Sequence, residues 1–88
     1  MKKYQVLFSK SAAKELRKFP SDIIKRVIEK SKELENDPRP MGCKKLAGET
    51  EELWRIRTGD YRIVYAVNDD ILIVDIRRVG HRKDVYKK

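Results

Sequence analysis

The side chains best suited to chemistry on a phosphate lie between residues 55 and 86. Six of the nine arginines fall there: Arg55, Arg57, Arg62, Arg77, Arg78 and Arg82. A guanidinium is planar, stays protonated, and binds phosphate through two N–H donors at once. These arginines can therefore bind phosphate and stabilise developing negative charge, but they cannot act as bases.

Proton transfer needs a different side chain, and two candidates lie close to these arginines. Histidine ordinarily titrates near neutrality, so His81 is one candidate. Tyr86 is the other, because nearby cations lower the pKa of a phenol. Together with Arg55, Arg57, Arg62 and Arg82, these residues are compatible with RNA cleavage in which a ribose 2′-OH attacks the adjacent phosphate, without a metal ion.

Composition alone leaves simpler interpretations open. A formal net charge of +8 and a pI near 9.7 favour RNA, DNA or an acidic protein as partner. Binding without cleavage is as compatible with that charge as catalysis is. His81 is alternatively a solvated residue, and Tyr86 alternatively packs back onto the protein. The lysines of the first half are interpreted as a solvated helix surface.

Length and composition exclude several classes of protein. With 88 residues the chain is predicted to form a single domain, residues 1–88. Its one cysteine, Cys43, excludes an intrachain disulfide and a cysteine-based zinc site. No apolar run approaches the length of a membrane span, and Met1–Lys3 leads into a short strand rather than a signal peptide. We therefore expect a soluble, cytoplasmic protein without membrane contact, metal, cofactor or small-molecule ligand.

The first half of the chain predicts a strand followed by two helices. Tyr4–Phe8 is a β-type run, and Ser9 is placed to cap a helix that ends before Pro20. Ser21 is predicted to cap the second helix. Apolar residues then recur at helical spacing: Ile23, Ile24, Val27, Ile28 and Leu34. The Asn36–Pro40 segment ends this helix, because proline cannot continue it.

The second half predicts an antiparallel β-meander. Leu53–Thr58, Tyr61–Asn68 and Ile71–Val79 are rich in β-branched and aromatic residues. Gly59 and Asp60 separate the first two runs and suit a two-residue hairpin turn. Lys44 to Leu46 is a weaker candidate strand. The pattern indicates an α+β fold, in which helices cover one face of a mostly antiparallel sheet.

The two-residue turn at Gly59 fixes which side chains share a face. It pairs Arg57 with Arg62, Ile56 with Ile63, and Trp54 with Tyr65. Because side chains alternate along a strand, the apolar members of these pairs face the helices. The arginines, including Arg55, face the other way. Like charges directly opposite one another are unfavourable, and a local rule broken in this way is typical of a functional site.

The third strand allows two registers. A two-residue loop at Asp69 and Asp70 places Arg77 with the other arginines and directs Leu72, Val74 and Ile76 to the core. A bulge or a three-residue loop reverses these assignments.

Four segments of the chain resemble toxins of the RelE/ParE superfamily from type II toxin–antitoxin pairs, and the resemblance covers nearly the full length. They are the N-terminal Tyr4–Ala12 with the following helical hairpin, Lys45–Gly48, the Leu53–Tyr65 run, and Arg78–Tyr86. The resemblance implies a RelE-like fold with a β-meander and helices on one sheet face.

In the RelE-like branch, the resemblance implies a ribosome-dependent mRNA endonuclease that cleaves in the A site, leaving a 2′,3′-cyclic phosphate and a 5′-hydroxyl. Arg62 and Arg82 would contact the scissile phosphate, and Tyr86 or His81 would move the proton. The predicted RNA contacts are Arg55, Arg57, Arg77, Arg78 and Lys83. The implied partners are a cognate antitoxin and the ribosome carrying mRNA.

Two other functions remain open at this point. A ParE-like inhibitor of DNA gyrase shares the fold without being a nuclease, but such inhibitors generally lack the full Arg62, Arg82 and Tyr86 set. A catalytically inactive module that only binds its antitoxin is the third possibility.

Overall fold

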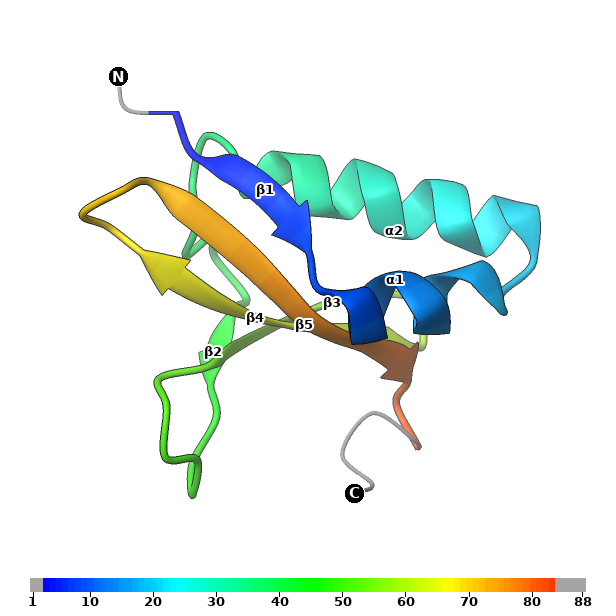
Figure 1. Ribbon diagram of the computed structural model, residues 1–88. Helices are drawn as coiled ribbons and strands as arrows, with labels where there is room; N and C mark the ends of the chain where they lie inside the picture. The colour runs from blue at the N-terminus through cyan, green and yellow to red at the C-terminus, as the bar shows by residue number, and fades with distance from the viewer. Residues whose placement is uncertain (1–2, 84–88) are drawn as a thin grey trace.

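A computed structural model describes residues 3–83, in which two helices cover one face of a five-stranded sheet (Figure 1). The elements in chain order are β1 (Gln5–Phe8), α1 (Lys10–Arg17), α2 (Ser21–Glu33), β2 (Lys44–Lys45), β3 (Trp54–Thr58), β4 (Tyr61–Asn68) and β5 (Ile73–His81). The strand order is β1-β5-β4-β3-β2, with β1 parallel to β5 and the other neighbours antiparallel. The predicted α+β fold is confirmed. Neither helix in this part of the chain is long and apolar enough to cross a membrane.

The two helices begin differently. Ser9 caps α1 as predicted, since its Oγ accepts a hydrogen bond from the Ala12 N–H at 3.1 Å. The prediction that Ser21 caps α2 is wrong, because Ser21 is already the first helical residue. Pro20 is the cap, with an extended backbone (φ −58°, ψ 152°), and its carbonyl accepts from Ile23 and Ile24 at 3.0 Å each. The fixed φ of proline suits this position, which needs no N–H donor.

The buried side of α2 is centred on Val27, Ser31 and Leu34. The Ser31 hydroxyl donates to the Val27 carbonyl at 2.7 Å, which satisfies the one polar group on this face. Ile28, which the helical spacing groups with these residues, is 38% exposed. A helix turns by about 100° per residue, so a side chain next to Val27 lies at the rim of the buried face.

The β3–β4 hairpin has the predicted register at every pair, from Trp54 with Tyr65 to Thr58 with Tyr61. Gly59 has φ +59°, the positive value that a tight hairpin turn requires. Ile56 and Tyr65 are buried against the helices. The hairpin therefore fixes the faces as the alternation predicted.

The β4–β5 connection is longer than predicted. It spans residues 69–72, because the Asn68 side chain accepts hydrogen bonds from the N–H groups of Asp70 and Ile71 and widens the turn. Leu72, which was expected in the core, has φ +55° and is only half-buried. Since the connection is longer by two residues, the alternation is preserved, and Val74 and Ile76 are buried as predicted.

A β-bulge then changes the alternation within β5. Val64 pairs with Arg78 whereas Tyr65 pairs with Ile76, so Arg77 is the extra residue. Beyond the bulge Val79 enters the core, and Arg78 joins the opposite face. Before the bulge the strand follows the predicted register that directs Val74 and Ile76 to the core. After the bulge it follows the reversed register.

Candidate nucleic-acid interface

Four arginines lie on the face of the sheet that the helices leave uncovered. The strand register places Arg57 opposite Arg62, and Arg55 and Arg78 on either side of Val64. Arg57 is exposed, and the other three are half-buried. We call Arg55, Arg57, Arg62 and Arg78 the arginine face. The predicted shared face of the first three is confirmed; their roles in RNA binding stay predictions.

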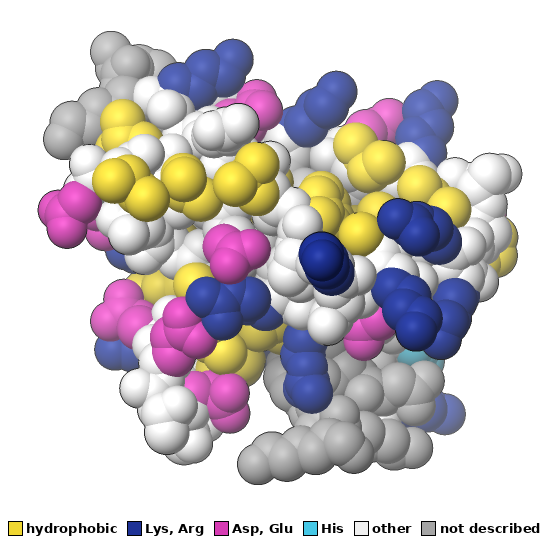
Figure 2. Space-filling view, viewed as in Figure 1, with side chains coloured by type: hydrophobic (Ala, Val, Ile, Leu, Met, Phe, Trp, Pro, Cys, Tyr) yellow, Lys and Arg dark blue, Asp and Glu magenta, His cyan; other side chains and the backbone are white. Residues whose placement is uncertain are grey.

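The basic residues of the helices have a different setting. Figure 2 shows the positive side chains over α1 and α2 interspersed with acidic and apolar ones. Lys30, for example, pairs with Glu33 one turn along α2 at 3.3 Å. Such mixing is typical of a solvated helix surface. The concentration of arginine across three strands is therefore the more informative feature.

Arg82 joins the end of the arginine face through the backbone. Its N–H donates to the Asp60 carbonyl at 2.7 Å, which continues the β4–β5 pairing beyond the last strand residue. Gly80, two residues earlier, pairs with Arg62. Arg62 and Arg82 are therefore diagonal neighbours in the strand register.

The contacts that these two guanidinium groups make within residues 3–83 are long. Arg82 Nε lies 3.9 Å from Asp60 Oδ1, in an ion pair that is more than half exposed. Arg62 Nη1 lies 3.5 Å from the Gly59 carbonyl, at the outer limit of a hydrogen bond. Exposed contacts of this length are weak. A phosphate would displace them easily.

His81 lies on the other side of the sheet. His81 pairs with Tyr61, which lies on the same face of β4 as the buried Ile63, two residues further along. The rings of His81 and Tyr61 are arranged edge to face, with their centres 5.7 Å apart. The ring of Tyr61 in turn lies against that of Phe19, with the ring centres 5.0 Å apart. The sequence grouped His81 with the arginines, but the structure does not bring them together, because the bulge changes the alternation of β5.

Two further candidates lie at the C-terminal end of the chain. Lys83 is exposed, and its N–H donates to His81 Nδ1 at 3.3 Å. Tyr86 lies outside the described residues. The catalytic roles of Tyr86 and His81 and the RNA contact of Lys83 therefore stay predictions.

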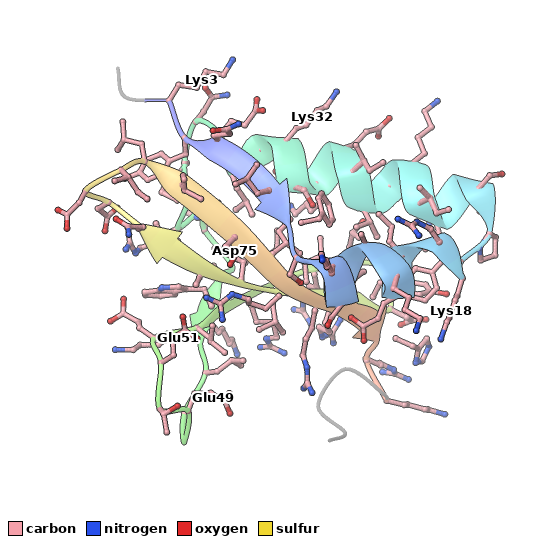
Figure 3. All side chains as sticks on the ribbon, in the orientation of Figure 1. Lys3, Lys18, Lys32, Glu49, Glu51 and Asp75 are labelled. Atoms are coloured by element: carbon pink, nitrogen blue, oxygen red, sulfur yellow. The ribbon has the colours of Figure 1, made fainter. Side chains whose placement is uncertain are left out.

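Arg77 differs from the other arginines because carboxylates occupy its donors. Its Nη1 and Nη2 donate to the two carboxylate oxygens of Glu51, and its Nε donates to Asp75 Oδ2, each at 2.7 Å. The hydrogen bonds to Glu51 raise the pKa of Arg77 most, against the opposing effect of burial, and Asp75 adds to the rise. Figure 3 shows Glu51 on the loop below the sheet and Asp75 on β5. The ion pair between Arg77 and Glu51 was not predicted from the sequence, because the two residues are 26 positions apart.

A cavity of about 730 Å³ lies beside the arginine face. Val64, only 2% exposed, lies in its lining with Leu46 and Leu53 from the loop and Arg78 from β5. The pattern of residues over this loop is weak, so the cavity was not predicted. Within residues 3–83, no three or more His, Cys, Asp or Glu side chains are grouped to hold a metal ion.

A second ion pair joins the connection between β4 and β5 to the segment after α2. Arg39 donates to both carboxylate oxygens of Asp69, at 3.2 and 2.8 Å, and lies 5.3 Å from the ring centre of Trp54. The hydrogen bond to Asp69 raises the pKa of Arg39. Trp54 packs against the core, and Tyr65 is fully buried, as predicted for both. Both aromatic rings therefore contribute to the packing of the protein.

Solved toxins share this fold, and together with the family match below they identify the class of protein as a RelE/ParE superfamily toxin. The toxin–antitoxin complex RelBE2 from Mycobacterium tuberculosis contains a chain 34% identical with a TM-score of 0.84, over 96% of this chain and 97% of that one.

The family follows from sequence comparison. Residues 6–86 match the model of the ParE toxin of the type II toxin–antitoxin system parDE, so the chain belongs to this family of toxins. It is also similar to Toxin RelG of Mycobacterium tuberculosis, 35% identical over 97% of this chain and 98% of the relative. Toxin RelE3 of Methanocaldococcus jannaschii is 38% identical over 93% and 94%.

Proposed function

We propose that this toxin is an endoribonuclease that cleaves mRNA in the ribosomal A site. The observation that carries the proposal is the arginine face, with Arg62 and Arg82 together at one end of it. Similarity to toxins named RelE and RelG supports the same activity. Action on the ribosome would place the protein in the cytoplasm.

In the proposed reaction, the ribose 2′ oxygen forms a bond to the adjacent phosphorus while the bond from phosphorus to the 5′ oxygen breaks. A base removes the 2′ proton, and the leaving 5′ oxygen gains a proton. The products are a 2′,3′-cyclic phosphate and a 5′-hydroxyl. Arg62 and Arg82 would stabilise the extra negative charge that develops on the phosphate oxygens, a role for which fixed cations are suited. No step needs a metal ion.

We propose Tyr86 rather than His81 as the base, because the His81 ring already has partners within the protein. Nδ1 of His81 accepts a hydrogen bond from Lys83, so in the neutral ring the proton is on Nε2. The ring also packs against Tyr61, on the helix side of the sheet. We therefore expect His81→Gln to retain more cleavage than Tyr86→Phe.

The rest of the arginine face would hold the RNA strand on either side of the cleaved bond. Arg55, Arg57 and Arg78 would each neutralise a phosphate, with Lys83 as a further contact. Binding of this kind releases counterions, so affinity for RNA falls as salt rises. About four phosphate contacts on a single strand correspond to a slope near −3 in log affinity against log salt. A flat salt dependence would count against the proposal.

A cognate antitoxin is the proposed protein partner. The similar M. tuberculosis structure is a toxin–antitoxin complex. An acidic or amphipathic antitoxin segment would complement the positive charge of this protein, whose formal net charge is +8.

Mapping of 5′ ends in a translating extract tests the nuclease proposal. Addition of the protein should produce new 5′-hydroxyl ends in phase with codons, and Arg62→Ala should abolish most of them. Arg26→Ala is the matched control, because Arg26 is exposed on α2, on the other side of the sheet. Absence of codon-phased ends would contradict the proposal.

Inhibition of DNA gyrase is a second candidate, favoured by the match to the ParE toxin model over residues 6–86. A supercoiling assay with purified gyrase distinguishes the two. Inhibited supercoiling with intact messages would identify a gyrase inhibitor, and cleaved messages with normal supercoiling would identify the nuclease.

A further inference from the structure

We infer that Arg77 forms an additional phosphate-binding site on the sheet, and that the Glu51 carboxylate closes this site in the free toxin. The ligand would be a phosphodiester of the RNA strand that runs along the arginine face. The inference rests on the proposed RNA-binding function of that face.

The first argument is the geometry of the guanidinium. Asp75 binds Nε, whereas Glu51 binds Nη1 and Nη2 in parallel, each at 2.7 Å. Arginine binds phosphate in the same way, with Nη1 and Nη2 donating to two phosphate oxygens. The carboxylate of Glu51 thus occupies the place that two phosphate oxygens would take.

The second argument is position. Arg77 is the extra residue of the bulge, directly before Arg78, and both line the 730 Å³ cavity. Asp75 and Arg77 are both in β5, so this carboxylate holds the guanidinium in place whatever the loop does. The guanidinium is therefore held in one orientation, and the cavity beside it has room for a nucleotide.

The third argument is charge. Arg77, Glu51 and Asp75 together carry one positive and two negative charges, so the closed site repels RNA. Removing the Glu51 charge leaves Arg77 and Asp75 with no net charge, and it frees Nη1 and Nη2 of Arg77 to bind a phosphate. The pair is partly exposed, at 36% for Arg77 and 48% for Glu51, so a polyanion can compete with it. Glu51 thereby sets where the RNA-binding surface ends.

The test is binding of a short single-stranded oligoribonucleotide, measured by fluorescence anisotropy across a salt series. The probe carries 2′-O-methyl groups, which prevent cleavage. Glu51→Gln should bind about fivefold more tightly at about 0.1 M salt, and its slope of log affinity against log salt should steepen by about 0.7, as one further phosphate contact on a single strand requires. Adding Arg77→Ala to Glu51→Gln should remove this gain.

Glu52→Gln is the matched control. It makes the same charge change in the same loop, but Glu52 pairs with Lys45 at 3.3 Å rather than with an arginine of β5. Equal gains in both variants would overturn the inference, because net charge alone would explain them. Weaker or unchanged binding of Glu51→Gln, in protein with the circular dichroism of the wild type, would overturn it as well.

Failure of this inference is distinguishable from failure of the proposed function. Arg62→Ala should weaken binding of the same probe. If it does and Glu51→Gln brings no gain, the closed site is wrong and the RNA-binding face stands. If Arg62→Ala has no effect, the RNA-binding proposal itself fails.

Discussion

Neighbouring residues of the β3–β4 hairpin have opposite environments. Ile56 and Ile63 pair across the strands and are buried beneath the helices, at 3% and 0% exposure. One position along, Arg57 and Arg62 pair on the uncovered face. The first pair contributes to stability through burial, and the second opposes it through repulsion. The same backbone thus carries stability on one face and charge for binding on the other, so mutations on the two faces should separate these properties.

The largest expected effect on stability comes from the covered face. Ile63→Ala removes a fully buried side chain that pairs with Ile56 and Val79. We expect the free energy of unfolding to fall by about 2–5 kcal/mol, because the cavity it leaves is only partly filled by relaxation. Urea unfolding measures this. The same change at Ile28, on the partly exposed rim of α2, should have a much smaller effect, and an equal loss would contradict the assignment of the core.

On the uncovered face, Arg62→Ala should separate activity from stability. Loss of one group that stabilises transition-state charge ordinarily lowers the rate by about 10²–10³-fold, so we expect that loss in mRNA cleavage. The free energy of unfolding should change by no more than about 0.5 kcal/mol, as for other surface substitutions. Cleavage assays and urea unfolding of one preparation check both. A protein that unfolds more readily and loses activity in proportion would contradict the separation.

A smaller effect is expected at Tyr65, where the buried face has a polar group. Its hydroxyl donates to the Pro38 carbonyl at 2.7 Å, and burial raises the pKa of Tyr65 well above its ordinary value. Tyr65→Phe should lower stability at neutral pH by about 1 kcal/mol through loss of this hydrogen bond.

The raised pKa of Tyr65 also predicts the sign of an alkaline effect. The folded protein retains the Tyr65 proton at a pH where the unfolded chain loses it, so wild-type stability should fall as pH rises above about 10. Tyr65→Phe should lack this part of the fall. Urea unfolding from about pH 8 to about pH 11 measures it. A pH dependence that Tyr65→Phe leaves unaltered would show that other groups cause it.

The smallest effect is expected from relief of charge repulsion. Arg57→Gln should raise the free energy of unfolding by up to about 0.5 kcal/mol, because it removes a like charge opposite Arg62. Salt should reduce this gain by screening. Thermal unfolding at low and high salt checks it, with Arg26→Gln on α2 as the control. A gain that is independent of salt would have a cause other than repulsion.

The sequence predicted best where short-range chemistry determines geometry. A two-residue turn at Gly59 leaves one register for the hairpin, so all five pairs and the face of the arginines followed from it. Ser9 was recognised as a cap for the same reason, since its partner Ala12 is three residues away. Family resemblance added what local chemistry lacks, namely the toxin class.

Prediction failed where distant residues decide. The bulge at Arg77 is a feature of the pairing between β4 and β5, and it determines the face of His81. The widened turn after β4 depends on an Asn68 side chain that was read only as the end of a strand. Glu51 reaches Arg77 only because the fold brings its loop to β5. Sequence spacing does not encode contacts of this kind.

The parallel pairing of the first and last strands also bears on how the protein is made. Gln5 pairs with Ile73, so the chain must close a loop of 68 residues before β1 has its partner. During synthesis β1 emerges first and β5 last, and β5 also supplies Arg78 and leads to Arg82. The arginine face is therefore completed only after β5 has left the ribosome. Until then the hairpin that carries Arg55, Arg57 and Arg62 lacks the strand beside it, and the protein lacks its core.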